Sequence, residues 1–506
     1  MDASETDTQT QRDHVVGQGT AIGLAFGSSA AVLVLELVSL RLVAPYLGLT
    51  LETNTTVIGV ALAAIATGAA LGGRFADVVP PTRSLGPLLV VAGGFVMLVL
   101  PVARWTGSEV RAGRDGLVFL AVGAAMFVPA AMLSAVTPMV TKLRLASLAE
   151  TGTVVGRLSA WATAGAIAGT VLTGFVFVAN VPTSSIVLGL GCLLAVAGTV
   201  LTIVLRGLRD AAGPLVFALI GAGATLAAPE HCELETAYHC ARVVADPARP
   251  GGRTLYLDVH RHSYVDLDDP AHLEFEYARG MAAVIEGHRP GTEPLQALHI
   301  GGGGLTIPRY LQHTRPGTRN QVYEIDAGVV DIDVERLGAR LGDDLRVAVQ
   351  DGRTGIRSEP DRTYDVVVGD AFGGPAVPWH LTTRELVADV RRVLRPGGIY
   401  AVNLIDFGEL AFARAEVRTV RAEFPHVAVL SRRTVLDRTG SGGNIVVVGS
   451  DEPLPAERIR GELERRVTGW DLLGTDEELD RFVGDAPLLT DDFAPVDQLL
   501  TPYGET

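Results

Sequence analysis

Glycine-rich and acidic features follow four successive apolar segments in the second half of this chain. The turn Gly301–Gly304 follows LQALHI, Glu324 ends NQVYEI, Asp351 follows LRVAV, and Asp370 ends YDVVVGD. A glycine turn lets the backbone approach a ligand closely, and a carboxylate accepts hydrogen bonds from hydroxyl and amino groups. Each feature alone is also compatible with a turn or a helix cap, but four in succession predict one nucleoside-binding site.

The positions of these features assign separate parts of a nucleoside to them. Glu324 stands about twenty residues after the glycine turn, the place of the acid that accepts the ribose hydroxyls in dinucleotide-binding folds. Asp351 is placed to accept from an adenine amino group beside the backbone of Gly352. The predicted nucleoside-binding residues are therefore Gly301, Gly302, Gly303, Glu324, Asp351 and Gly352.

Such a site needs a scaffold that brings the strand ends together. Strand-like and helix-like segments alternate from LQALHI to NIVVVGS, and the strand-like segments are continuously apolar. This pattern is typical of a mostly parallel sheet covered by helices on both faces, in which ligands bind at the carboxyl ends of the strands. We expect this α/β domain over residues 291–450, a β-rich subdomain with a linking helix over 230–290, and a helical segment over 451–506.

The first half of the chain has a different composition. Seven apolar segments recur there, and most reach the roughly 20 residues that a helix needs to cross a bilayer. We therefore expect a polytopic helical membrane bundle over residues 19–229, after a polar tail over 1–18, with the lipid bilayer as a partner. The segments are Thr20–Leu47, Thr55–Gly73, Leu85–Ala103, Gly116–Val140, Leu158–Val181, Ser185–Leu205 and Pro214–Ala228.

Small residues and prolines inside these segments predict local details of the bundle. Two pairs of glycines at four-residue spacing suit close packing of helices in lipid. Two prolines in the fourth segment predict a kink, because proline removes a helical hydrogen bond. The glycine pairs are Gly68/Gly72 and Gly165/Gly169, and the prolines are Pro129 and Pro138.

The formal charge is concentrated in the second half of the chain. Residues 1–230 contain twelve acidic and twelve basic side chains, whereas residues 231–506 contain forty-five acidic and thirty basic ones and so carry the whole net charge of −15. An acidic domain repels nucleic acid and suits a cationic substrate, although ordinary solubility also explains this charge. We expect no nucleic-acid partner.

Cationic residues are distributed unevenly between the loops of the predicted bundle. The loops after the second, fourth and sixth segments carry seven arginine and lysine residues, and the loops after the first, third and fifth carry three. The positive-inside rule then places the C-terminal domain outside the cytoplasm, where Cys232 and Cys240 would be permitted to pair. Nucleotide cosubstrates are cytosolic, however. We expect a multi-pass protein of the cell membrane, and the sequence leaves the side of its C-terminal domain open.

Six stretches between roughly Glu233 and Gly449 form a specific combination: GRTLYLDVHRHSYVDLDDP, LHIGGGG, VYEIDAGVV, QDGR, YDVVVGDAF and LRPGGIYAVN. This combination resembles the spermidine synthases, the polyamine aminopropyltransferase family, in their membrane-fused bacterial form. The resemblance implies a small β-hairpin subdomain followed by a Rossmann-like, methyltransferase-type domain. It also implies transfer of the aminopropyl group of decarboxylated S-adenosylmethionine, the cosubstrate, to a polyamine substrate such as the diamine putrescine, with methylthioadenosine as product.

The resemblance also implies roles for individual residues. Asp370 would be the catalytic base that keeps the attacking amine neutral. An alkylamine with a pKa near 10.4 is almost wholly protonated at pH 7, so a carboxylate must attract the cation and then accept its proton. Weaker candidates for substrate binding are Tyr238, Tyr277 and His380. No cysteine or histidine spacing indicates a metal site.

Positions that handle amines in this family depart from its pattern. Gly304 and Gly373 stand where the family has aspartates. Tyr277 is followed by alanine in place of the family's histidine, and Tyr238 by His239 in place of its glutamine. Other acids could supply the missing groups, although a helix start capped by Thr490 also explains the last two: Glu274, Glu276, Asp491 and Asp492.

Three functions are therefore compatible with the sequence. The first is a membrane-anchored aminopropyltransferase of the spermidine synthase type. The second is another S-adenosylmethionine-dependent transferase, such as a methyltransferase, on the same sheet. The third is a non-catalytic module of a transporter-like membrane protein that binds a nucleoside or polyamine. A homodimer is compatible with all three.

Overall fold

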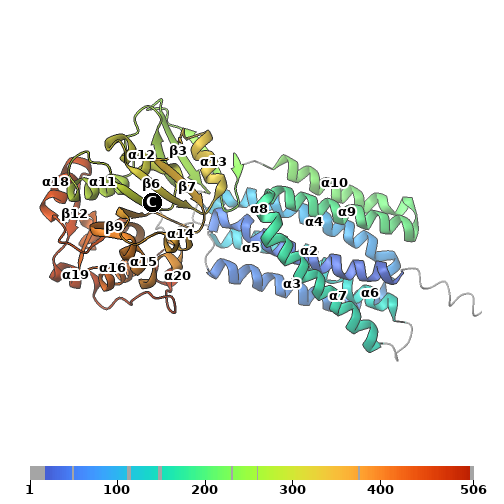
Figure 1. Ribbon diagram of the computed structural model, residues 1–506. Coiled ribbons are helices and arrows are strands. Elements are labelled where there is room, and N and C mark those ends of the chain that lie inside the picture. The colour runs from blue at the N-terminus through green and yellow to red at the C-terminus, as the bar shows by residue number, and fades with distance from the viewer. Residues whose placement is uncertain are drawn as a thin grey trace, which may run out of the picture. The chain divides into compact units, whose positions relative to one another are not determined.

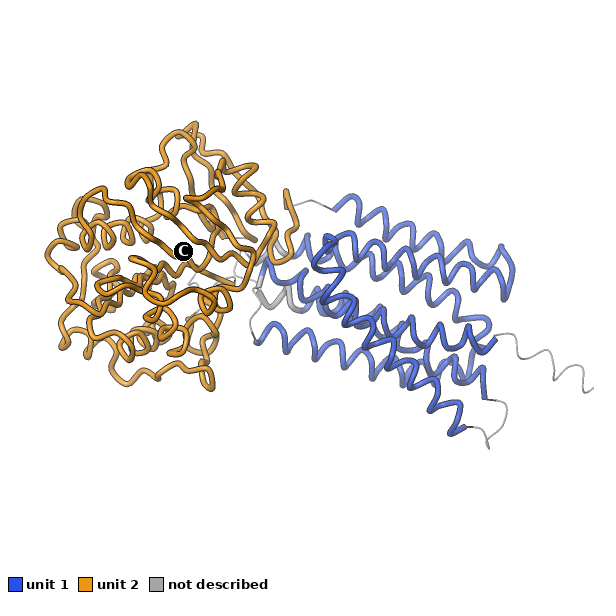
Figure 2. Tube along the Cα trace, in the orientation of Figure 1, with its two compact units in different colours: residues 1–231 blue, residues 232–506 orange. Residues whose placement is uncertain are grey.

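The computed structural model describes residues 17–47, 51–110, 115–145, 151–228, 232–258, 260–373 and 376–501. The chain divides into two compact units, Met1–His231 and Cys232–Thr506 (Figure 2). Most of the expected polar tail (residues 1–16) and residues 229–231 at the expected domain boundary lie outside the described residues.

The N-terminal unit is a bundle of long apolar helices (Figure 1). By length and composition, seven helical spans of the described residues suffice to cross a membrane, so the expected seven-span bundle is confirmed and the chain has the character of a multi-pass membrane protein. Its elements are α2 (Gln18–Leu47), α3 (Leu51–Val78), α4 (Pro81–Val110), α5 (Asp115–Ser134), α6 (Val136–Arg144), α7 (Thr151–Leu172), η2 (Thr173–Phe177), α8 (Val178–Asn180), α9 (Thr183–Arg206), η3 (Leu208–Ala211) and α10 (Ala212–Ala227).

The glycine pairs lie where two helix backbones meet. A Cβ atom added to Gly68 would fall well inside 3.0 Å of the Ala131 backbone, so only glycine lets α3 pack this closely on α5. Gly165 on α7 is covered in the same way by the Phe26 backbone of α2. The fourth span is interrupted at Ala135, three residues before Pro138, which has no N–H to donate to Ser134. The predicted close packing is confirmed. The fourth span is interrupted before Pro138, whereas α5 continues without a break through Pro129.

The C-terminal unit begins with a small antiparallel sheet of strand order β1-β2-β3-β4. Its apolar face, which includes Leu255 and Val265, shares a core with Val329 and Ile332 of the helix α13 (Ala327–Glu335). This shared core holds the small sheet against the larger one. The elements of this part are β1 (Leu234–Glu235), β2 (Cys240–Ala245), β3 (Gly252–Leu257), β4 (His260–Asp266) and the linking helix α11 (Glu276–His288).

The large sheet has eight strands in the order β12-β10-β11-β9-β8-β5-β6-β7. Neighbours from β7 to β9 pair in parallel, whereas β11 is antiparallel to both β9 and β10. Its strands are β5 (Gln296–Ile300), β6 (Arg319–Glu324), β7 (Leu345–Val349), β8 (Tyr364–Gly369), β9 (Leu394–Phe407), β10 (His426–Arg432), β11 (Gly442–Ser450) and β12 (Trp470–Leu473).

Helices cover both faces of this sheet (Figure 1). One apolar core joins the sheet to α11, α12 and α18, and another joins it to α14, α15, α16 and α19. The expected α/β architecture is therefore confirmed. The remaining elements are η4 (Gly303–Leu305), α12 (Thr306–Thr314), α13 (Ala327–Glu335), α14 (Gly352–Ser358), η5 (Trp379–Leu381), α15 (Arg384–Val393), α16 (Ala411–Glu423), α17 (Arg433–Leu436), α18 (Ala456–Arg466), α19 (Asp476–Val483) and α20 (Val496–Leu499).

The segment after residue 450, which the sequence predicts to be helical, also contains the edge strand β12. It pairs antiparallel with β10, with Trp470 opposite Arg432. The Trp470 ring is buried against Gly280 of α11, and its Nε1 donates to Glu276 Oε2 at 3.1 Å. Four residues are too short for an alternating pattern, so the strand depends on tertiary pairing that the local sequence does not show.

Candidate functional site

The four predicted features lie along one edge of the large sheet. Strands β7, β6, β5 and β8 are adjacent and parallel, so Asp351, Glu324, the turn Gly301–Gly304 and Asp370 follow the carboxyl ends of four neighbouring strands. Backbone hydrogen bonds tie the ends together, because Asp370 N donates to Ile300 O at 2.8 Å and Gly301 N donates to Tyr323 O at 2.9 Å. This edge is where ligands bind in sheets of this type.

The glycine turn is packed too closely for side chains. Gly301 has φ +97°, and an added Cβ would fall well inside 3.0 Å of Asp370 O. Gly302 N donates to Glu324 Oε2 at 2.8 Å, which holds the turn beside the end of β6. The turn, β6 and β8 are thus brought into direct contact.

Glu324 is buried and both of its oxygens accept backbone hydrogen bonds. Oε2 accepts from Gly302 N, and Oε1 accepts from Asp326 N at 2.9 Å. Burial raises the pKa of Glu324, and these two hydrogen bonds oppose the shift. Each carboxylate oxygen has a second lone pair, so the geometry leaves acceptor capacity for two ribose hydroxyls. That role stays a prediction.

Replacing Glu324 with glutamine is expected to weaken methylthioadenosine binding by roughly 1.5–3 kcal/mol, because a charge-assisted acceptor is lost. Titration calorimetry on the purified full chain measures this change. Glu335→Gln is the matched control, since Glu335 lies on α13 and is exposed. An unchanged dissociation constant for Glu324→Gln would remove Glu324 from the ribose-binding role.

Asp351 is the N-cap of α14 and pairs with a predicted substrate-binding residue. Its Oδ1 accepts from Arg353 N and Thr354 N, both at 3.0 Å, and its Oδ2 lies 2.9 Å from His380 Nε2. Burial acts to raise the pKa of Asp351, but the hydrogen bonds from Thr354 N–H and His380 outweigh it and hold the pKa below its usual value. Gly352 is buried, and an added Cβ would lie 2.5 Å from Ile300 Cγ2. The helix cap engages only Oδ1 of Asp351, and Oδ2 lies beside His380 instead.

Arg353 connects this part of the site to the C-terminal segment. Its Nη1 and Nη2 donate to Asp491 Oδ1 and Oδ2 at 2.7 and 2.5 Å, and Nη1 also donates to His380 O at 2.9 Å. Asp491, a candidate replacement for the missing acids, therefore forms a bidentate pair that positions the His380 loop. The capping threonine expected at residue 490 instead forms an isolated bridge with Phe493.

Asp370 is partly accessible and carries a perturbed carboxyl group. Burial raises its pKa to about 6, while hydrogen bonds from Asn403 and Tyr277 oppose the shift. Asn403 Nδ2 donates to Asp370 Oδ1 at 3.0 Å, and Asn444 Nδ2 donates to Asn403 Oδ1 at 3.1 Å. A carboxylate with a pKa near 6 is ionised at pH 7 and still basic enough to accept a proton.

The residues around Asp370 include one that the sequence predicted for the site and two that it did not. Tyr277, a predicted substrate-binding residue, is brought to Asp370. Asn403 and Asn444 are not among the predicted site residues, although each is a polar residue within an apolar strand, β9 and β11 respectively. Asn403 is buried, and a buried asparagine in such a strand needs a partner, which is the signal that could have identified it.

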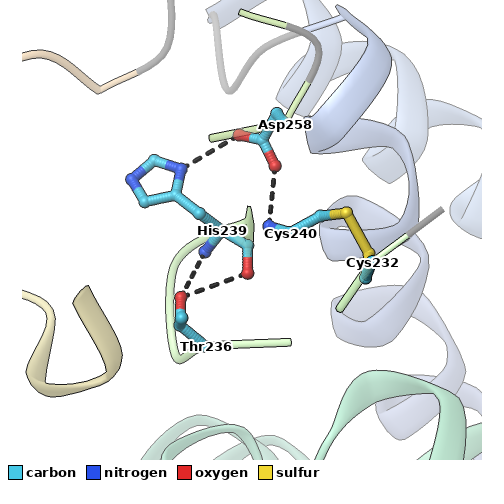
Figure 3. Close-up of a disulfide and its surroundings, with 5 residues drawn as sticks. All are labelled: Cys232, Thr236, His239, Cys240 and Asp258. Carbon is cyan, nitrogen blue, oxygen red and sulfur yellow. Dashed lines mark hydrogen bonds and ion pairs between the residues drawn. A yellow bond between two sulfur atoms is a disulfide. The ribbon is translucent and has the colours of Figure 1, made fainter. Parts of the chain in front are cut away.

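The small sheet contributes a histidine–aspartate pair (Figure 3). His239 Nδ1 lies 2.9 Å from Asp258 Oδ2, and Cys240 N donates to Asp258 Oδ1 at 2.9 Å. Burial acts to lower the pKa of His239, but the hydrogen bond and charge of Asp258 raise it above its usual value. The preceding Tyr238 lies between β1 and β2, and its side chain is 46% exposed.

The next residue of β2 forms a disulfide. Cys240 is bonded to Cys232, eight residues earlier, so the pair closes a short loop at the start of the C-terminal unit (Figure 3). Among the residues that the structure describes, no group of three or more His, Cys, Asp and Glu side chains is arranged to hold a metal ion.

Comparisons with known proteins place this unit among adenosyl-dependent transferases. No model of a known protein family matches the chain. A polyamine aminopropyltransferase from Vibrio vulnificus is 30% identical over 135 residues, which cover 26% of this chain and 45% of that protein. An eEF1A lysine and N-terminal methyltransferase from Danio rerio is 28% identical over 144 residues, which cover 27% of this chain and 21% of that protein. The chain thus spans about half or less of the length of these curated relatives.

Solved structures give a similar set of matches. A probable spermidine synthase from Corynebacterium glutamicum is 27% identical, with a TM-score of 0.48, over 52% of this chain and 97% of the other. Together with the sequence relatives, the sheet order assigns the C-terminal unit to a spermidine synthase-like, S-adenosylmethionine-dependent transferase fold. More particularly, it is a polyamine aminopropyltransferase-like domain, distantly homologous to the spermidine synthases, and it follows the apolar helices of the N-terminal unit.

Proposed function

We propose that this protein is a membrane-anchored aminopropyltransferase that uses decarboxylated S-adenosylmethionine and a diamine. The observation that carries the proposal is Asp370, whose carboxyl group has a pKa of about 6 and lies beside the glycine turn. Such a base suits an amine nucleophile, which must lose a proton before it attacks. Gly302 and Glu324 are hydrogen-bonded at the same edge, where a nucleoside would bind.

The proposed reaction is a single displacement. The diamine nitrogen forms a bond to the aminopropyl carbon attached to the sulfonium, and the bond between that carbon and sulfur breaks. The electron pair leaves with methylthioadenosine, which becomes neutral. The proton lost by the attacking nitrogen passes to Asp370 and then to solvent, which the partial exposure of this residue permits. The net charge of −15, all carried by the second half, favours the approach of a cationic amine.

A methyltransferase is the second candidate, and the match to an eEF1A lysine and N-terminal methyltransferase favours it. Incubating the purified full chain with labelled decarboxylated or ordinary S-adenosylmethionine, each with putrescine, separates the two. Methylthioadenosine release from the decarboxylated cosubstrate supports the aminopropyltransferase. S-adenosylhomocysteine release from the ordinary one supports the methyltransferase, and binding without turnover supports a non-catalytic module.

We further propose that the C-terminal unit lies outside the cytoplasm. The Cys232–Cys240 disulfide and the placement of arginines in the loops independently favour that side. On that side the unit depends on cosubstrate and amine that have left the cytoplasm.

Thiol labelling in intact cells tests this orientation. The chain has three cysteines, so Cys192→Ala leaves only the pair Cys232 and Cys240. We expect a membrane-impermeant maleimide to label these cysteines only after treatment with an impermeant reductant. Labelling that needs no reductant but requires permeabilised cells would place the unit in the cytoplasm.

A further inference from the structure

Buried polar atoms without a hydrogen-bond partner gather around Gly303 and Gly304. Among the described residues these atoms include Asp333 Oδ2, Ser263 Oγ and His262 Nδ1. The other oxygen of Asp333 accepts from Gly304 N at 2.9 Å. A Cβ added to Gly304 would meet Ser263 Oγ, and a Cβ added to Gly303 would lie 2.6 Å from His262 Nδ1. All three groups therefore adjoin the same two residues of the turn.

These groups come from separate elements that packing holds in place. Asp333 lies on α13, and His262 and Ser263 lie on β4 of the small sheet. The shared core of that sheet and α13 fixes their separation. Buried polar side chains in folded proteins nearly always have a partner, so three unpartnered atoms at one turn indicate a ligand group that completes them.

The charge at this place indicates what kind of group that is. Asp333 is fully buried, and burial together with the charge of Glu324 raises its pKa well above its usual value. The charge of Arg309 opposes this shift, but its Nη1 donates to Leu337 O at 2.6 Å rather than to Asp333. An ionised Asp333 would therefore lack a hydrogen-bonded cation, and a cationic ligand group placed beside it would stabilise the carboxylate. Burial lowers the pKa of His262 to about 4, so at pH 7 it is neutral and one ring nitrogen can accept.

We propose that Asp333, Ser263 and His262 form a subsite for a primary ammonium group on the adenosyl cosubstrate. A primary ammonium has three N–H donors, and the subsite offers three acceptors. The aminopropyl tail of decarboxylated S-adenosylmethionine carries such a group and no carboxylate. The tail of ordinary S-adenosylmethionine adds a carboxylate, which Asp333 and Glu324 would repel. The acid that the family carries at position 304 is then supplied from α13.

This inference rests on the proposed function, and it predicts that Asp333 contributes to the affinity for the amine-bearing cosubstrate but not to the affinity for methylthioadenosine. Asp333→Asn is expected to weaken binding of decarboxylated S-adenosylmethionine about tenfold or more, the scale of a lost charge-assisted hydrogen bond. Binding of methylthioadenosine, which lacks the amine, should change less than about twofold. Asp331→Asn is the matched control on the exposed face of α13. Titration calorimetry on the full chain in detergent measures the dissociation constants of both ligands for the wild type and for the two variants.

The outcomes separate this inference from the proposed function. If the wild-type chain binds methylthioadenosine but Asp333→Asn leaves the affinity for the decarboxylated cosubstrate unchanged, the subsite is refuted and the proposed function stands. If no adenosyl ligand binds the wild-type chain, both are refuted. If Asp333→Asn also loses methylthioadenosine binding, Ser263→Ala decides. A selective loss of affinity for the amine-bearing ligand in that variant supports the subsite, and an unchanged affinity overturns it.

Discussion

Replacing Asp370 with asparagine is expected to lower kcat by about 10²–10⁴-fold, the usual contribution of a positioned general base. Asparagine preserves the shape of the side chain and its contact with Asn403, but it cannot accept the proton of the attacking amine. Methylthioadenosine binding should be nearly unchanged, because the role proposed for Asp370 is toward the amine and not toward the nucleoside. Single-turnover kinetics with saturating cosubstrate measure the effect.

The pH dependence of the wild-type enzyme provides a second readout of the same prediction. Asp370 acts as a base only when ionised, so kcat/KM should fall as the pH is lowered through about 6, the value to which burial raises its pKa. Asp361→Asn is the matched control, since Asp361 precedes the same strand and its side chain is 71% exposed. If the Asp370→Asn variant still turned over, and its kcat/KM still fell as the pH was lowered through about 6, Asp370 would be excluded as the base.

Restoring aspartate at position 304 is expected to damage the protein rather than improve it. Gly304 has φ +75°, which costs other residues about 1–2 kcal/mol, and an added Cβ would collide with Ser263 Oγ. Crowding of this kind typically costs a further 1–3 kcal/mol. Gly304→Asp should therefore destabilise the C-terminal unit by roughly 2–5 kcal/mol.

The melting transition that methylthioadenosine shifts in the full chain reports on this unit. Gly342→Asp is the matched control, because a Cβ at Gly342 would meet nothing within 4 Å. The double variant with Ser263→Gly should recover part of the loss, since it removes the collision and leaves the backbone strain. An unchanged transition in Gly304→Asp, together with increased turnover, would instead mean that the turn accepts the acid of the family pattern.

The amine-handling positions show why a family pattern transfers only in part. When the sequence is compared with the family, Gly304 indicates that an aspartate has been lost at this position. In the structure, the space at Gly304 is occupied by Ser263, and the buried carboxylate of Asp333 adjoins its backbone. These residues are 41 and 29 positions away in the chain, so no local motif relates them to the turn.

The local sequence pattern was sufficient to predict the helices and strands and the edge of the sheet at which the candidate site lies. Seven long apolar segments predict seven spans, because the thickness of a bilayer sets the length of an apolar helix. Apolar strands that end in Glu324 or are followed by Gly301, Asp351 and Asp370 predict a shared edge, because parallel strands present their carboxyl ends together. These properties follow from periodicity and length, which the chain carries at short range.

Only the tertiary structure decided which side chains meet. The Asn444–Asn403–Asp370 series joins three strands, the Arg353–Asp491 pair joins residues 138 positions apart, and β12 exists through its pairing with β10. Burial likewise sets the pKa of Asp370, and burial is a property of the packed unit. Contacts between distant segments depend on how the sheets and helices pack, and that packing is not encoded in any single stretch of sequence.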